Sequence, residues 1–211
     1  MEFDDGISGL YSGLYENRRE AELSLADILR HDWSPREIPQ RRSTQNLPRK
    51  DVDLRIFMSY DRPKDLFGAV SEFRRRLQNE IRMRLSARIF LDTLGIRPGD
   101  RWQARLKNEI KQADAFVALT SPAWFNSKWG VWEYTQFCQK EAEAGRAPRV
   151  LGVTWVRCLP EMRQRHPIAL QFATLQECDW SDLRHDPIHS PQASRSLDNL
   201  ADAIINLANL A

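Results

Sequence analysis

Residues 115–133 of this chain read AFVALTSPAWFNSKWGVWE, and their pattern sets the architecture. An uninterrupted apolar run at residues 115–119 predicts a buried strand, and Ser121-Pro122 then breaks the pattern. Trp129 and Glu133 follow four residues apart, a spacing that places an indole and a carboxylate on one face of a helix. A strand that passes into such a helix predicts a place to hold a ligand, although a lone pair of this kind is more often packing and solvent contact.

Apolar segments of strand length alternate with amphipathic segments of helix length on both sides of this stretch. Strands are expected at residues 54–58, 88–91, 115–119, 150–155 and 175–180. Helices are expected at residues 66–85, from Asp100 onward, from the Trp129 segment to Gly145, and from an N-cap at Ser196 onward. The alternation predicts an α/β fold, in which a central parallel sheet of about five strands has about five helices on its two faces.

Residues 1–52 form a separate compositional block ahead of this pattern. A helix is expected at residues 16–30, and the polar, proline-containing stretch at residues 34–50 indicates a linker. The 211 residues therefore divide into an N-terminal extension, residues 1–52, and one domain of ordinary size, residues 53–211. The extension is either a helix packed on the domain or a tail that becomes ordered on self-association.

Composition excludes several classes of protein. A hydrophobic fraction of 42% with 28% charged residues is typical of a soluble globular chain, and a net charge of +2 gives no strong field to attract nucleic acid. The arginines at residues 74–88 are interleaved with acids, which favours a solvated helix face over a nucleic-acid surface. No apolar run approaches the ~18 residues of a membrane span, and the acidic start lacks a secretory signal. We therefore expect a cytoplasmic protein with no nucleic-acid or membrane partner.

The cysteines do not form a metal-binding pattern. They are three in number, lie twenty residues apart, and include no CxxC pair: Cys138, Cys158 and Cys178. The histidines are scattered and are not spaced as a ligand set. Buried thiols and no metal site are expected.

Polar and aromatic residues follow three of the predicted strands. Residues 59–62 follow the first strand, residues 92–99 the second, and residues 121–133 the third. Right-handed crossovers place the carboxyl ends of parallel strands along one edge of the sheet, where ligands bind in α/β folds. The three segments are therefore expected to share a cleft.

These blocks resemble the Toll/interleukin-1 receptor (TIR) domain family. The family's first box is similar to FMSYDR at residues 57–62, and its flexible loop is similar to LDTLGIRPGDRW at residues 91–102. Its third box is similar to SPAWFNSKWGVWE at residues 121–133. The resemblance covers residue 53 to about residue 210, and it implies the flavodoxin-like TIR fold, which agrees with the parallel sheet expected above.

The resemblance also implies an activity. Many TIR domains, notably in bacteria and plants, cleave NAD+ at the nicotinamide–ribose bond, and their catalytic glutamate in the third box corresponds to Glu133. NAD+ is then the substrate, and no cofactor is implied. Because nicotinamide leaves as a neutral pyridine, cleavage needs no general acid, only an ionised carboxylate that stabilises an oxocarbenium-like ribosyl cation. We expect a bacterial-type NAD+ glycohydrolase in immune or antiviral defence, whose product is linear or cyclic ADP-ribose.

Several uncharged residues are expected to bind NAD+ by the same resemblance. Trp129 and Tyr60 would stack on the nicotinamide or adenine ring, whereas Phe57, in mid-strand, is more often a core residue. Ser59 lies in the first box and is expected to touch the substrate. Ser121 would contact the substrate or only cap a turn.

Charged residues complete the expected site. Arg62 and Arg97 would hold the pyrophosphate through charge-assisted hydrogen bonds or lie on the surface, and Asp92 would touch a ribose or cap a turn. Two positions depart from the family pattern: Gly130 stands where cysteine is frequent, and Asp61 stands where some active members carry a basic residue.

The loop at residues 93–99 points to assembly. Gly95, Pro98 and Gly99 make it a hinge-prone segment, and such loops in the family join one TIR domain to another. We expect self-association through TIR–TIR contacts, activation on assembly, and an upstream sensor protein as a partner.

Two other functions fit the same features. The chain could be a non-enzymatic interaction module that signals only through TIR–TIR contacts. It could also be an enzyme of the nucleoside deoxyribosyltransferase type, which uses related α/β architecture and cleaves free nucleosides rather than NAD+.

Overall fold

The computed structural model describes residues 53–61, 68–91, 100–175 and 177–209. The expected N-terminal extension, with its helix and linker, lies outside the described residues. So do Arg62, Asp92 and Arg97, together with the loop at residues 93–99. The division into an extension and a domain therefore stays a prediction.

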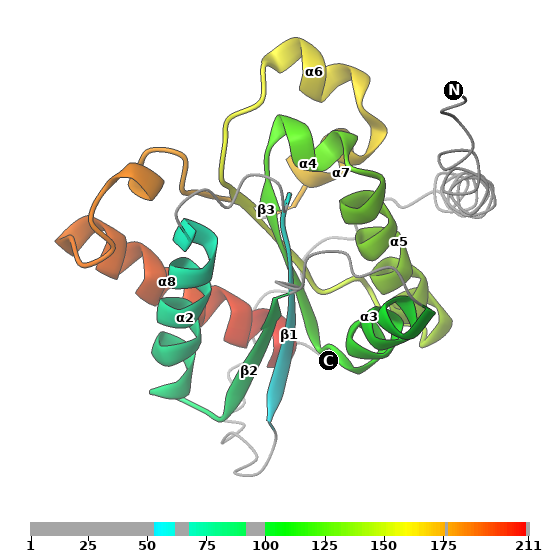
Figure 1. The fold of residues 1–211 in the computed structure, drawn as a ribbon, viewed down its shortest axis with the longest axis horizontal. Helices are drawn as coiled ribbons and strands as arrows, with labels where there is room; N and C mark the ends of the chain where they lie inside the picture. Colours follow the sequence, from blue (N-terminus) through cyan, green and yellow to red (C-terminus); the bar gives the residue numbers. More distant parts are fainter. Residues whose placement is uncertain (1–52, 62–67, 92–99, 176, 210–211) are drawn as a thin grey trace, which may run out of the picture. The chain divides into compact units, whose positions relative to one another are not determined.

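Five parallel strands form one sheet (Figure 1). In chain order they are β1 (Leu54–Ser59), β2 (Ala87–Leu91), β3 (Ala115–Thr120), β4 (Val150–Thr154) and β5 (Glu177–Asp179). Their order across the sheet is β2-β1-β3-β4-β5, and every pair of neighbours is parallel. This is the flavodoxin-like strand order, so the predicted fold class is confirmed.

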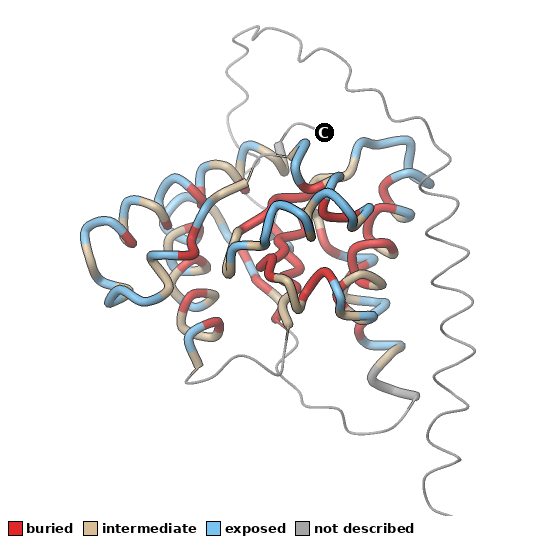
Figure 2. Tube along the Cα trace, turned by 90° about the horizontal axis from the view of Figure 1, so that it is seen from above, coloured by how far each residue is buried: buried red, intermediate tan, exposed pale blue. Residues whose placement is uncertain are grey.

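Four long helices cover the two faces of the sheet. One face is covered by α2 (Ala69–Arg82) and α8 (Pro191–Asn209), and the other by α3 (Asp100–Gln112) and α5 (Lys128–Glu143) (Figure 1). Figure 2 shows the buried residues gathered between these layers. The predicted arrangement of helices on both faces is confirmed.

The sequence predicted too few helices in the described ranges. Three short helices were missed: α4 (Pro122–Asn126), α6 (Pro160–Arg165) and α7 (Pro167–Ala173). A 3-10 helix, η3 (Leu183–His185), follows β5. Each of the three α-helices begins with proline, whose fixed φ and missing N–H suit the first helical position. Helices this short leave no periodic apolar pattern over a long window, so periodicity does not reveal them.

The ends of two helices test the predicted caps. The α8 helix begins at Pro191, and Ser190 Oγ accepts a hydrogen bond from the N–H of Ala193 at 3.2 Å. The predicted cap at Ser196 was therefore wrong, because this serine lies inside the helix. The α5 helix ends at Glu143, and Gly145 has a φ of 68°, the left-handed conformation that glycine adopts readily. The predicted end near Gly145 is confirmed.

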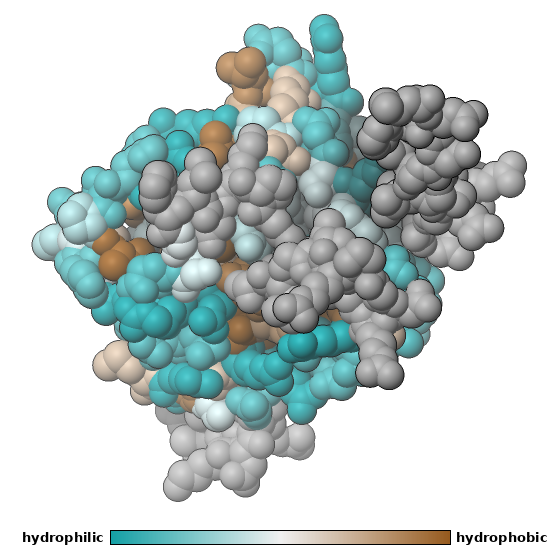
Figure 3. Space-filling model, in the orientation of Figure 1, coloured by the Kyte–Doolittle hydropathy of each residue, from teal (hydrophilic) through white to brown (hydrophobic). Residues whose placement is uncertain are grey.

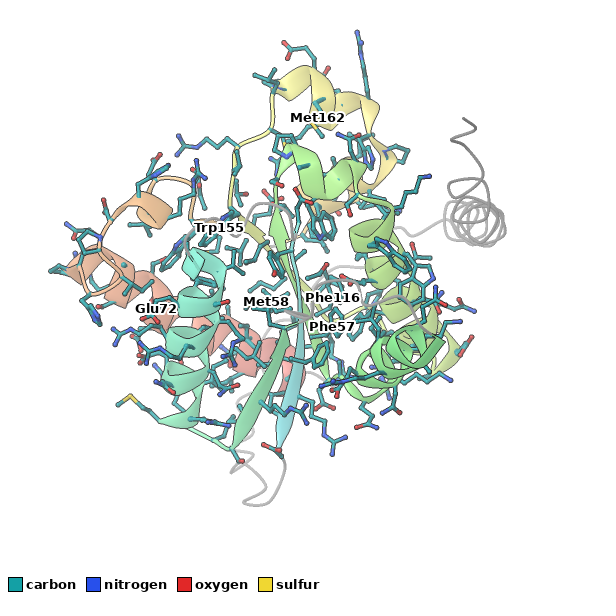
Figure 4. All side chains as sticks on the ribbon, in the orientation of Figure 1. Phe57, Met58, Glu72, Phe116, Trp155 and Met162 are labelled. Atoms are coloured by element: carbon teal, nitrogen blue, oxygen red, sulfur yellow. The ribbon has the colours of Figure 1, made fainter. Side chains whose placement is uncertain are left out.

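The two faces of the sheet bury different side chains. Under α2 and α8 the core is mainly aliphatic. On the other face the rings of Phe57 and Phe116 stack with centroids 5.6 Å apart, and Phe90 lies 5.4 Å from Phe57. Figure 4 shows Phe57 and Phe116 on the α3 and α5 side of β1, and Met58 on the opposite side. Phe57 is thus a core residue, the reading that its mid-strand position favoured.

The alternation along β1 decides where Ser59 lies. Successive side chains of a strand point to opposite faces. Ile56 and Met58 belong to the cluster under α2 and α8, and Phe57 packs on the opposite face. Ser59 falls two residues after Phe57 and therefore faces α5.

A buried cluster of ion pairs fixes the C-terminal end of α5. The side chain of Glu141 is 0% exposed and pairs with Lys140 Nζ at 2.9 Å, Arg146 Nε at 3.1 Å and Arg149 Nη2 at 3.2 Å. Burial by itself raises the pKa of Glu141, but hydrogen bonds from Arg146 and Lys140 and the charge of Arg149 outweigh burial and hold the pKa at about 2. Glu141 is therefore a structural carboxylate.

The surface seen in Figure 3 is mostly hydrophilic, and its hydrophobic residues lie in small separate groups. Across the described residues, the large hydrophobic side chains that are exposed belong to Met83, Leu159 and Leu170. None of the helices in the described ranges is both long and apolar enough to cross a bilayer.

Candidate active site

The carboxyl edge of the sheet brings together segments that are far apart in the chain. Ser59 is the last residue of β1 and lies opposite Ala118 of β3, whose small side chain leaves room beside the serine. After β3 the chain passes through α4 to Ser127, whose Oγ caps α5 by accepting from the N–H of Gly130 at 3.3 Å. The first turns of α5 therefore start at this edge and carry Glu133 toward β1.

Glu133 is the central residue of this site. It is 4% exposed, and its Oε2 accepts a hydrogen bond from Ser59 Oγ at 2.5 Å. Burying a carboxylate is costly unless hydrogen bonds replace the water that it has lost, and Ser59 supplies one such hydrogen bond. Two residues that the sequence singled out, 74 positions apart, are thus in direct contact.

Trp124 joins this pair, and the sequence did not single it out. It is 0% exposed, and its indole Nε1 donates a hydrogen bond to Ser59 Oγ at 2.9 Å. The signal that could have found it is the Ser121-Pro122 pair, which starts a one-turn helix and places the third residue after the cap in a defined position. The break after β3, expected to be only an interruption, is the helix α4 that carries this indole.

Ser121 caps α4, one of the two roles expected for it. Its Oγ accepts a hydrogen bond from the N–H of Trp124 at 3.0 Å, and the residue is buried. Contact with a substrate stays a prediction for this residue.

Replacing Ser121 with alanine should lower the free energy of unfolding by about 1 kcal/mol, because the cap of α4 is lost. Urea denaturation followed by circular dichroism measures the change. Ser127→Ala, which removes the cap of α5, is the matched control and should have an effect of similar size. An unchanged unfolding midpoint in Ser121→Ala would contradict the capping role.

The two predicted stacking residues lie in different surroundings. Trp129 is half-buried on α5, one turn before Glu133, and its ring meets that of Trp132 edge to face with centroids 5.8 Å apart. Tyr60 is half-buried and packs against the cluster under α2 and α8, the face opposite to Ser59. The structure therefore places Trp129 on the same helix as Glu133 but does not place Tyr60 on the same face of the sheet. Stacking on NAD+ stays a prediction for both residues.

The same helix holds two buried glutamates in different electrostatic settings. Glu133 and Glu141 are eight residues apart on α5, about 12 Å along the helix axis. Three cationic side chains surround Glu141 and offset its charge, so Glu141 is suited to stability. Glu133 lies at the carboxyl edge of the sheet, where Ser59 Oγ donates to its Oε2. Its position at this edge, where ligands bind in open parallel sheets, makes Glu133 the glutamate suited to chemistry.

The cysteines are free thiols. Cys138 is buried, and burial raises its pKa to about 12, so the thiol stays protonated at neutral pH. Cys158 and Cys178 are half-buried, and burial raises the pKa of each thiol. The expectation of buried thiols is confirmed for Cys138 and is only partly right for the other two. Among the described side chains, no group of three histidines, cysteines or acids is placed to hold a metal ion.

Comparison with known proteins identifies the family. The model of the TIR domain family matches residues 56–195, which include most of β1, all of β3, Ser59 and Glu133. No curated protein is similar enough to count as a match. A solved structure of the TIR domains of the activated Roq1 resistosome directly recognizing the pathogen effector XopQ is 11% identical, covers 74% of this chain and 84% of its own, and superposes with a TM-score of 0.37. The assignment therefore rests on the family match, and the chain belongs to the TIR domain family.

Proposed function

We propose that this TIR domain is an NAD+ glycohydrolase and that Glu133 is its catalytic residue. The observation that carries the proposal is the buried Glu133 carboxylate, which accepts a hydrogen bond from Ser59 at the carboxyl edge of the sheet. Ligands bind at this edge in open parallel sheets. Membership of the TIR family supports the choice of NAD+ as the substrate.

The proposed reaction breaks the bond between C1′ of the ribose and the nicotinamide nitrogen. The bonding electron pair goes to nicotinamide, which leaves as a neutral molecule, and a positive charge develops on the ribose. The Glu133 carboxylate stabilises this charge, and the low dielectric of a buried site strengthens the interaction. Water then attacks C1′ and releases a proton, which gives ADP-ribose, or the adenine ring attacks instead and gives the cyclic product.

Ser59 has a positioning role in this mechanism. Its hydroxyl holds one carboxylate oxygen, Oε2, and thereby fixes the orientation of the carboxyl group. The second oxygen, Oε1, is then set in a defined direction, from which it can accept a hydrogen bond from a ribose hydroxyl. Trp129, one turn away, is proposed to pack against the nicotinamide ring.

The proposal extends to assembly and biological role. We propose that self-association of TIR domains, driven by an upstream sensor protein, activates the site. The activity would then act in cytoplasmic immune or antiviral signalling by depleting NAD+ or by making an ADP-ribose signal.

Chromatography of NAD+ incubated with the purified full-length chain tests the proposal. We expect nicotinamide and either ADP-ribose or cyclic ADP-ribose to appear, and the rate per molecule to rise when the protein is clustered on a multivalent carrier. Inosine, a free nucleoside, should not be cleaved. Clustered protein that is shown to self-associate but leaves NAD+ intact would overturn the proposal and favour a non-enzymatic interaction module.

A further inference from the structure

Three buried side chains at the site form a continuous hydrogen-bonded chain. Trp124 Nε1 donates to Ser59 Oγ at 2.9 Å, and Ser59 Oγ donates to Glu133 Oε2 at 2.5 Å. The three residues come from α4, β1 and α5, so the chain of bonds joins three separate elements. All three residues are less than 5% exposed, with Trp124 at 0%, Ser59 at 1% and Glu133 at 4%.

When Glu133 is ionised, as the proposed function requires, the chemistry of the three groups allows only one direction for these bonds. An indole N–H can donate but not accept, an ionised carboxylate can accept but not donate, and a serine hydroxyl has one proton to give. Because Trp124 donates to the oxygen of Ser59, the serine proton is directed to its other polar neighbour, Glu133. A hydroxyl without the indole could rotate and present a lone pair to the carboxylate instead, which would repel it.

Gly130 supplies the room that the indole requires. A Cβ at residue 130 would lie 2.7 Å from Trp124 Nε1 and 2.9 Å from Cδ1, closer than carbon atoms come in folded proteins. Glycine inside a helix costs about 1 kcal/mol relative to alanine, so its presence in α5 has a packing reason. The glycine that departs from the family pattern is therefore matched by the large ring at residue 124.

Two aromatic rings also pack against the indole. Phe125 and Phe172 meet the Trp124 ring edge to face, with centroids 5.2 Å and 5.3 Å away. The ring is thus enclosed by α4, α5 and α7, and its N–H points at Ser59.

We propose that Trp124 is a positioning residue of the active site, which acts through Ser59 to fix the direction of the hydrogen bond received by Glu133, and that Gly130 is its necessary partner. This inference rests on the proposed function for its kinetic consequence. Because Trp124 is fully buried, it affects the catalytic step rather than substrate contact.

Steady-state kinetics of NAD+ cleavage by the clustered full-length protein test the role of the indole N–H. Trp124→Phe removes the N–H and keeps a ring, and it should lower kcat about tenfold while KM changes less than about twofold. Gly130→Ala keeps the N–H but displaces the ring, and it should lower kcat in the same way. The matched control is Trp180→Phe: Trp180 is 0% exposed, lies in the cluster under α2 and α8, and has an Nε1 with no partner among the described residues. Its kcat per folded molecule should equal that of the wild type.

A spectroscopic measurement tests the same contact without any need for activity. The indole N–H resonance of Trp124, assigned by its loss in Trp124→Phe, should exchange faster with solvent in Ser59→Ala and should shift in Glu133→Gln. An unchanged resonance in both variants overturns the inference, as does a kcat of Trp124→Phe and Gly130→Ala equal to that of Trp180→Phe. A wild-type protein that leaves NAD+ intact but shows the expected changes of the resonance would overturn the proposed function and leave the positioning contact standing.

Discussion

Replacing Glu133 with glutamine should lower the rate of NAD+ cleavage by roughly 10²- to 10³-fold or more, since the charge that stabilises the ribosyl cation is removed. The fold should be retained, because glutamine has the same shape and its amide oxygen can still accept the hydrogen bond from Ser59 Oγ. The rate is measured as nicotinamide released by the clustered full-length protein, and the fold by circular dichroism and by the urea midpoint.

Glu143→Gln provides the control for this substitution. Glu143 is an exposed residue of the same helix, and its carboxylate accepts a hydrogen bond from Gln139 at 3.0 Å. This variant should cleave NAD+ at the wild-type rate. If Glu133→Gln retained that rate as well, the charge at residue 133 would have no part in the reaction.

Replacing Glu141 with glutamine should have the opposite effects to Glu133→Gln. It should lower the free energy of unfolding strongly and leave the rate of NAD+ cleavage per folded molecule unchanged. The substitution leaves Lys140, Arg146 and Arg149 around a buried neutral group. We expect the free energy of unfolding at pH 7 to fall by about 2 to 3 kcal/mol, a value below that of a fully buried pair because Arg146 can still reach water. Urea denaturation measures the loss, with Glu143→Gln as the control that should change the midpoint little.

The contribution of Glu141 should also depend on pH in a defined direction. Its folded-state pKa, about 2, lies below its ordinary value of 4.5, so the folded state binds the proton less readily than the unfolded state. The stabilisation is complete above about pH 4.5 and is lost as the pH falls toward about 2. The difference in stability between the wild type and Glu141→Gln should therefore shrink over this range, and a difference that stayed constant would show that the ion pairs are not its source.

The strands that build the site could be predicted because their sequences admit few other structures. The apolar runs at β1 and β3 are too short for buried helices and are bounded by polar residues, so their strand character and parallel pairing follow. The spacing of Trp129 and Glu133 on α5 follows equally from helix geometry. That Ser59 and Glu133 lie close together then follows from the rule that right-handed crossovers place the carboxyl ends of parallel strands along one edge of the sheet.

The position of Tyr60 agrees with strand alternation continued by one residue, because Tyr60 follows Ser59 directly and packs on the opposite face. The role of Trp124, by contrast, depends on a five-residue helix and on a space left by a glycine six positions later. This contact is not visible as periodicity, because it joins separate elements rather than residues within one element.

Trp124 and Gly130 share one space in the core, so the sizes of the side chains at these two positions are linked. Any side chain added at residue 130 would take space from the indole, so size at one position can increase only as size at the other decreases. A segment grafted from another TIR domain with cysteine at residue 130 would therefore also have to carry a residue smaller than tryptophan at residue 124. Exchange of either residue alone would disturb the hydrogen bond from residue 124 to Ser59 Oγ.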